Sequence, residues 1–168
     1  MKKIIIFVLA ACMLLSFAGC QSGTTEEKKP GGYQDANNFA FTYKGTEIKL
    51  AAPAEPVIAA LGEPMKYTES ASCAFDGLDK QYYYGSFYLE TYPEGDKDFI
   101  YGWWFADDSI STPEGIYIGA AQADVEKAYG AESFNGTNSF AVKQGNGTLT
   151  ILLEKGVVSS IQYNLNVE

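Results

Sequence analysis

A short apolar segment, a helix-like segment and a closing glycine occur in the same order at two places in this chain. The first copy covers residues 48–62 and the second covers residues 116–130. Corresponding apolar positions lie 68 residues apart, as Val57 and Val125 do. Repetition at a fixed spacing is typical of a duplicated structural unit, so the pattern predicts two tandem modules.

Each copy is predicted to contain one short helix, at residues 53–61 and 121–129. Their apolar residues recur at helical spacing, and Gly62 and Gly130 are the residue type that commonly ends a helix. The apolar residues 116–118, just before the second helix, are expected to form a short strand.

Most of the remaining chain alternates apolar and polar residues, which is the period of a strand with one buried face. The expected strands lie at residues 39–43, 47–50, 65–69, 72–75, 80–84, 87–92, 99–106, 149–153 and 157–165. Helices combined with such strands predict the α+β class, as two helix-plus-antiparallel-meander modules with the helices packed on one face of the sheet. The first α+β module is assigned to residues 39–106 and the second to residues 107–168.

Two hairpins can be aligned from the sequence. Residues 85–86, Gly-Ser, are typical of a two-residue turn that sets Tyr83 opposite Tyr88 and leaves Phe87 on the expected core face.

The last hairpin allows two registers. A two-residue turn would oppose the apolar residues of its first strand with Gln, Ser and Val, whereas a three-residue loop at 154–156 opposes them with Ile, Ser and Val. The second match is more apolar and gives Gly156 the left-handed position, so we expect the three-residue loop.

The first module is expected to present aromatic residues on its outer face, namely Tyr83, Tyr88, Tyr92 and Trp104. The outer face of the second module carries mainly Thr, Ser, Gln and Asn. Tyr and Trp give large contact areas at a small entropic cost and are enriched at binding hot spots, so these four residues are the predicted partner-binding site. If a loop or the other module covers them, the same residues belong to the core.

Lys2 and Lys3 precede an apolar run over residues 4–15, and small residues then lead to Cys20. This pattern is typical of a secretory signal and is too short for a transmembrane helix. Residues 18–20, Ala-Gly-Cys, resemble the lipobox of bacterial lipoproteins, with Phe17 where that family usually has Leu. The resemblance implies a signal peptide at residues 1–19, lipid attachment to Cys20, and a location on the extracytoplasmic face of the cell membrane.

Residues 20–38 contain almost no large apolar side chain, so they predict a flexible tether.

The net charge of −9 and the absence of Arg argue against nucleic acid as a partner. The chain has no His, which removes the usual catalytic triads and imidazole acid–base chemistry. We therefore predict no enzyme activity, no catalytic residue, no metal and no cofactor. Cys73 is interpreted as a buried, inert thiol, and the aspartates as turn and surface carboxylates.

A short helix that ends in Leu-Gly or Tyr-Gly before a meander resembles the module of the small outer-membrane-assembly lipoproteins. In tandem, the pattern resembles the β-lactamase inhibitory proteins, and it covers both modules. The resemblance implies a sheet whose helix-free concave face binds a protein, and it transfers no particular binding residue. We therefore expect a non-catalytic, lipid-anchored surface protein that binds a protein or peptide. The alternatives are a cell-envelope assembly or scaffold lipoprotein and a glycan-binding module, because Tyr and Trp also stack on sugar rings.

Overall fold

The structure is a computed structural model that describes residues 32–131, 134 and 136–167. Strands account for 47% and helices for 12% of the described residues. In chain order the elements are β1 (Ala40–Tyr43), β2 (Thr46–Lys49), α1 (Ala54–Leu61), β3 (Lys66–Ala71), β4 (Leu78–Tyr83), β5 (Phe87–Glu94), β6 (Lys97–Phe105), α2 (Gln122–Tyr129), β7 (Ser139–Gln144), β8 (Gly147–Glu154) and β9 (Val157–Leu165).

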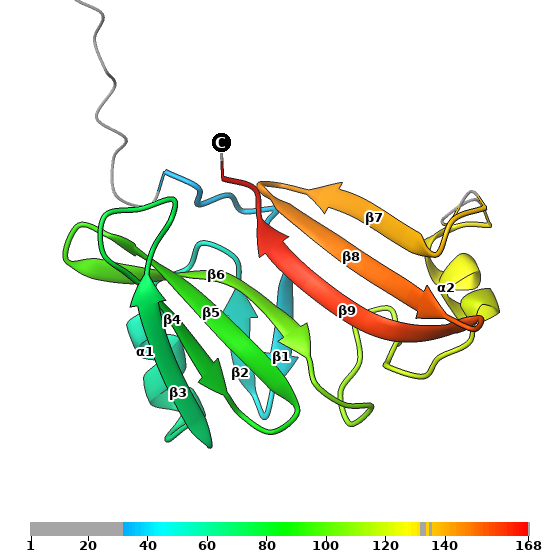
Figure 1. Ribbon diagram of the computed structural model, residues 1–168, viewed down its shortest axis with the longest axis horizontal. Coiled ribbons are helices and arrows are strands. Elements are labelled where there is room, and N and C mark those ends of the chain that lie inside the picture. Colours follow the sequence, from blue (N-terminus) through cyan, green and yellow to red (C-terminus); the bar gives the residue numbers. More distant parts are fainter. Residues whose placement is uncertain (1–31, 132–133, 135, 168) are drawn as a thin grey trace, which may run out of the picture.

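Seven of the strands form one antiparallel sheet in the order β3-β4-β5-β6-β9-β8-β7, and β1 pairs with β2 in a separate hairpin. The hairpin and α1 lie behind the large sheet in Figure 1. Helix α2 reaches the same side at the other end of the sheet, where Tyr129 packs on the buried Phe140 of β7 with ring centroids 5.0 Å apart. We call the covered side the inner face and the opposite side the outer face.

The predicted architecture of two tandem α+β modules is wrong, because the sheet is continuous and the described chain is mostly β. Strand β9 pairs with β6 through Gly102 with Asn164, Trp103 with Tyr163, and Trp104 with Gln162. This pairing satisfies backbone N–H and C=O groups that two separate modules would leave at open edges. The strand pattern indicated that β6 and β9 exist but carried no information on which strands become neighbours.

Both helices occur close to their predicted positions, each eight residues long. The strand expected at residues 116–118 is absent from the structure, and that segment is a turn region. Its conformation is held by hydrogen bonds from Thr112 N to Ile116 O and from Gly119 N to Val158 O, both 2.8 Å. Ile116 is buried there and fills the core from a loop.

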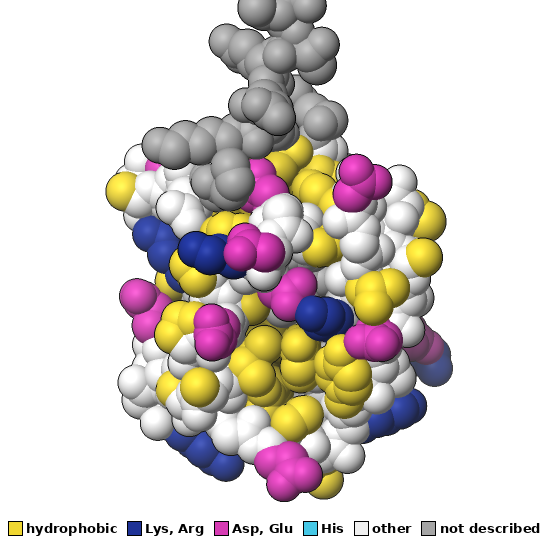
Figure 2. Space-filling model, turned by 90° about the vertical axis from the view of Figure 1, so that its left-hand side faces the viewer, with side chains coloured by type: hydrophobic (Ala, Val, Ile, Leu, Met, Phe, Trp, Pro, Cys, Tyr) yellow, Lys and Arg dark blue, Asp and Glu magenta, His cyan; other side chains and the backbone are white. Residues whose placement is uncertain are grey.

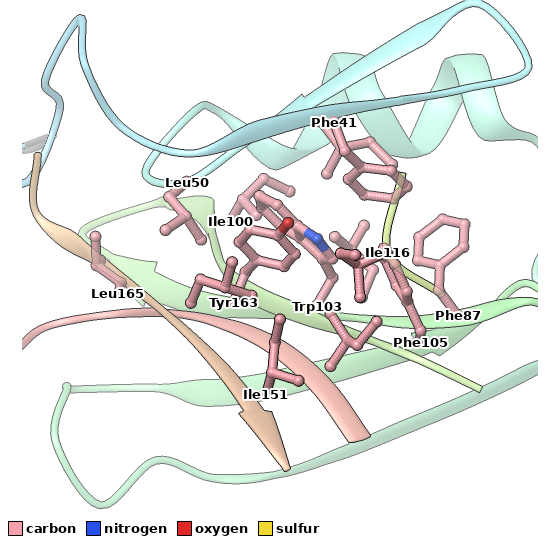
Figure 3. Close-up of a cluster of buried hydrophobic side chains, with 14 of the residues drawn as sticks. Phe41, Leu50, Phe87, Ile100, Trp103, Phe105, Ile116, Ile151, Tyr163 and Leu165 are labelled. Atoms are coloured by element: carbon pink, nitrogen blue, oxygen red, sulfur yellow. The ribbon is translucent and has the colours of Figure 1, made fainter. Parts of the chain in front are cut away.

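The core lies between the inner face of the sheet and the β1–β2 hairpin. Figure 3 shows Phe41 reaching from the hairpin toward Trp103 of β6, with Tyr163 of β9 beside the indole. The ring centroid of Trp103 lies 5.1 Å from that of Phe41 and 4.9 Å from that of Tyr163. Trp103 is fully buried, so the residues at the β6–β9 junction are held by packing as well as by pairing.

The register predicted for the first hairpin is confirmed, with Tyr83 opposite Tyr88 and Tyr82 opposite Leu89. The register predicted for the last hairpin is wrong. Its loop is the two-residue turn Lys155-Gly156, in which both residues have positive φ, 53° and 80°. A β-bulge after Leu152 then shifts the pairing by one residue, so the apolar residues face one another without a longer loop.

The folded region begins earlier than the predicted boundary at residue 39. Tyr33 is buried with its ring centroid 6.1 Å from that of Tyr92, and Asn38 is 4% exposed. Asn38 Nδ2 donates to Tyr33 O at 3.0 Å and to Leu50 O at 3.1 Å. The aromatic anchor and these hydrogen bonds hold residues 33–38 against the fold. Predictions for residues 1–31, including the signal peptide and Cys20, lie outside the described residues.

Candidate functional site

Three aromatic side chains on the outer face form a continuous stack, which we call the aromatic stack: Tyr83 of β4, Tyr88 of β5 and Trp104 of β6. Tyr83 and Tyr88 are cross-strand partners, as are Tyr88 and Trp104. Their ring centroids lie 4.4 and 4.8 Å apart, with planes inclined by 27° and 13°. All three side chains are half-buried, and Gln162 of β9 continues the row beyond Trp104.

The geometry of the aromatic stack determines what it offers to a ligand. Its centroid spacing is close to the distance between neighbouring strands, about 4.7–4.9 Å. Nearly parallel rings this close cannot lie flat side by side, so they overlap face to face and cover both faces of Tyr88. Such rings present mainly their edges and polar groups to a ligand, which suits contacts with a protein surface better than stacking on a sugar ring.

The structure does not bring Tyr92 into this row. Tyr92 is fully buried, so the prediction that it lies on an exposed surface is wrong. Phe75, from the loop between β3 and β4, covers it with ring centroids 4.5 Å apart, and Tyr33 packs on it edge-on. This burial raises the pKa of the Tyr92 hydroxyl above its usual range. No local pattern in the sequence indicates that two segments distant along the chain cover this position.

A pocket of about 230 Å³ adjoins the aromatic stack and was not predicted from the sequence. Its walls include Phe75 and Cys73 from the β3–β4 loop, Asp79 of β4, Glu90 of β5 and Tyr101 of β6. Cys73 is exposed, so its interpretation as a buried thiol is wrong. We call this site the acidic pocket.

A β-bulge shapes the acidic pocket. Along β5 and β6, Glu90 pairs with Gly102 and Thr91 with Ile100, which leaves Tyr101 without a partner in β5. The extra residue turns its ring toward the pocket, and Gly102 adds no side chain beside it. A regular strand pattern does not reveal such a bulge, although strand alternation places the carboxylate of Glu90 on the same face as Tyr88.

Glu90 is a half-buried carboxylate of the acidic pocket. Burial raises the pKa of its carboxyl, whereas the hydrogen bond from Gln81 Nε2 to Glu90 Oε1, at 3.2 Å, opposes that shift. The negative charge of Asp79 also raises the pKa of Glu90. Neither carboxylate forms an ion pair within the described part of the chain.

A second hollow lies on the side of the molecule seen in Figure 2, where hydrophobic side chains gather between acidic and basic ones. A pocket of about 430 Å³ between α1 and β6 is lined by Ile58, Tyr82 and Asp98. Asp98 is paired with Lys80, whose Nζ lies 2.6 Å from Asp98 Oδ2. The other charged residues of this lining are Glu55, Asp96 and Lys97, so it carries charges of both signs.

Residues 32–131, 134 and 136–167 contain no group of three or more His, Cys, Asp or Glu placed to hold a metal ion. Within the same residues, neither helix has the length and apolar character needed to cross a membrane. No family model, curated protein or solved structure matches this chain.

Proposed function

We propose that this protein is a non-catalytic, lipid-anchored protein of the extracytoplasmic membrane face that binds a protein or peptide partner through the outer face of its sheet. The single observation that carries the proposal is the aromatic stack of Tyr83, Tyr88 and Trp104, half-buried on the face opposite α1 and the β1–β2 hairpin. Rigid aromatic side chains bind at a small entropic cost, and a stack fixed by cross-strand neighbours needs little further ordering.

The lipid anchor in this proposal rests on the lipobox-like residues before Cys20. The absence of chemistry rests on the lack of His and of a catalytic motif in the sequence. An assembly or scaffold role would need no particular surface chemistry, and sugar binding needs free ring faces that Tyr88 lacks. A partner that contacts ring edges and hydroxyl groups therefore has the better support.

Site-specific photo-crosslinking in cells that produce the full chain tests the proposal. We would compare Tyr88→p-benzoylphenylalanine with Ala59→p-benzoylphenylalanine, which places the same crosslinker at an exposed position of α1. A discrete adduct from position 88 and not from position 59 is expected. Trp104→Ala, combined with the crosslinker at position 88, should reduce that adduct severalfold. Equal adducts from both positions, or no adduct from position 88, would contradict the proposal.

A further inference from the structure

We propose that the acidic pocket receives a basic side chain, Lys or Arg, of the partner protein that contacts the aromatic stack. This inference rests on the proposed function and names the chemistry that the partner must present. The site combines a partly open hollow, aromatic walls and two carboxylates, and it lies beside the surface already argued to bind a partner.

The size and lining of the acidic pocket suit one long side chain. Its volume of about 230 Å³ exceeds the ~150 Å³ cavity that accommodates benzene, so one long side chain fits. Phe75 and Tyr101 provide apolar and aromatic walls for an aliphatic stem. Aromatic rings also attract a cation held near their faces.

The charge of the acidic pocket is complementary to a basic side chain. Asp79, Glu90 and Tyr101 all line the pocket, so the three groups lie close together. Burial, followed by the negative charges of Glu90 and Asp79, raises the pKa of the Tyr101 hydroxyl. The lysine nearest in sequence, Lys80, is occupied by Asp98. An incoming ammonium or guanidinium group would therefore meet uncompensated negative charge in a partly desolvated site, where ion pairs are stronger than at an open surface.

The ligands that the acidic pocket offers do not suit a metal ion. Calcium takes six to eight oxygen ligands, typically from several carboxylates and carbonyls. The pocket offers Asp79 and Glu90, and Gln81 already uses one oxygen of Glu90. No cluster of three or more potential metal ligands exists among the described residues. A monovalent cation on an apolar stem matches this lining better.

The acidic pocket and the aromatic stack lie close together on the same face of the sheet. Glu90 lies two residues after Tyr88 on β5, and both belong to the outer face. Two residues of a strand span about 7 Å. One partner surface can therefore contact the aromatic stack and insert a side chain into the pocket at the same time, so we assign the cation to a protein partner rather than to a free amine.

The direct test is a titration of the full chain with Nα-acetyl-lysine N-methylamide. Binding is monitored through the backbone amide chemical shifts in NMR spectra. Nα-acetyl-norleucine N-methylamide is the matched probe, because it keeps the aliphatic stem and lacks the ammonium group. We expect saturable shifts at Asp79, Glu90 and Tyr101, and an affinity for the lysine probe higher by about fivefold, the effect of an ion pair of about 1 kcal/mol. Added salt should remove most of this preference.

The double variant Asp79→Asn/Glu90→Gln should bind the two probes equally, with the fold verified by circular dichroism. The matched control Asp107→Asn/Asp108→Asn removes two exposed carboxylates elsewhere and should keep the preference. Equal affinity of the unaltered protein for both probes, or shifts outside the pocket, would overturn the inference. The crosslink from position 88 would then still stand, so failure of this inference and failure of the proposed function give different results.

Discussion

Asn38 and Asn146 are joined by a hydrogen bond of 2.7 Å, from the backbone N–H of Asn146 to Asn38 Oδ1. Asn146 Nδ2 also donates to Tyr33 O at 2.9 Å, and Asn38 Nδ2 donates to the same carbonyl. The turn between β7 and β8 is thereby fixed to the segment that precedes β1. This network closes one side of the core through polar groups of which Asn38 is buried.

Asn38→Ala should lower the free energy of unfolding by about 2–4 kcal/mol. The substitution removes three hydrogen bonds and takes their partner from the buried Leu50 carbonyl and from the half-buried Asn146 N–H. Urea unfolding followed by tryptophan fluorescence measures the change. Asn37→Ala, at an exposed neighbouring position, should stay within about 0.5 kcal/mol of the original protein. Equal effects at both positions would show that the network contributes little.

Truncation of the two adjacent tryptophans should destabilise the protein by different amounts. Trp103→Ala should cost about 3–5 kcal/mol, because it removes a fully buried indole between Phe41 and Tyr163. Trp104→Ala should cost about 1 kcal/mol, since its half-buried ring loses mainly the contact with Tyr88. Thermal and urea unfolding of both variants provide the comparison. Similar losses would mean that the outer face is also part of the core.

The stability of the protein should fall above about pH 10 partly because of Tyr92. Burial raises the pKa of Tyr92 in the folded state, so this hydroxyl stays protonated while the unfolded chain begins to ionise near pH 10. Its contribution is complete below that pH and is lost at about 1.4 kcal/mol per pH unit above it.

Tyr92→Phe tests this dependence in urea unfolding experiments between pH 8 and pH 11. The variant should lose stability less steeply with rising pH. At pH 8 its stability should change by less than about 1 kcal/mol, because the Tyr92 hydroxyl has no hydrogen-bond partner among the described residues. An unchanged slope would contradict the assignment.

Glu90→Gln should stabilise the protein at pH 7. Burial raises the pKa of Glu90, so its protonated form favours folding at low pH, and this contribution is lost as the pH rises through the folded-state pKa. The amide removes the half-buried charge and keeps an acceptor for Gln81. The gain should shrink by about pH 4, near the ordinary pKa of a glutamate.

Glu47→Gln, at an exposed site on β2, is the control for the Glu90 substitution and should show no such gain at pH 7. Unfolding free energies from urea titrations at both pH values decide the comparison. A loss of stability in Glu90→Gln at pH 7 would mean that the carboxylate has a stabilising partner in the folded protein.

The parts of the structure that depend on neighbouring residues were predictable from the sequence. The turn at residues 85–86 fixes its own register, so Tyr83 and Tyr88 were placed opposite each other correctly. Trp104 was also assigned to the outer face, because its position follows from strand alternation.

The parts that depend on distant segments were not predictable. The pairing of β6 with β9 joins residues about sixty positions apart, and a strand pattern does not choose among possible partners. Phe75 and Tyr33 cover Tyr92 from a loop and from the segment before β1. The acidic pocket depends on the bulge at Tyr101, which alternation of apolar and polar residues cannot reveal.

The position of β9 in the sheet has a consequence for biogenesis. Strand β9 follows all the other strands along the chain, yet it occupies a place between β6 and β8. During synthesis, Gly102–Trp104 of β6 therefore lack a partner strand on one edge until Val157–Leu165 has emerged. The vulnerable interval for this protein is the last stage of its synthesis, when a nearly complete chain still exposes an aromatic strand to other polypeptides.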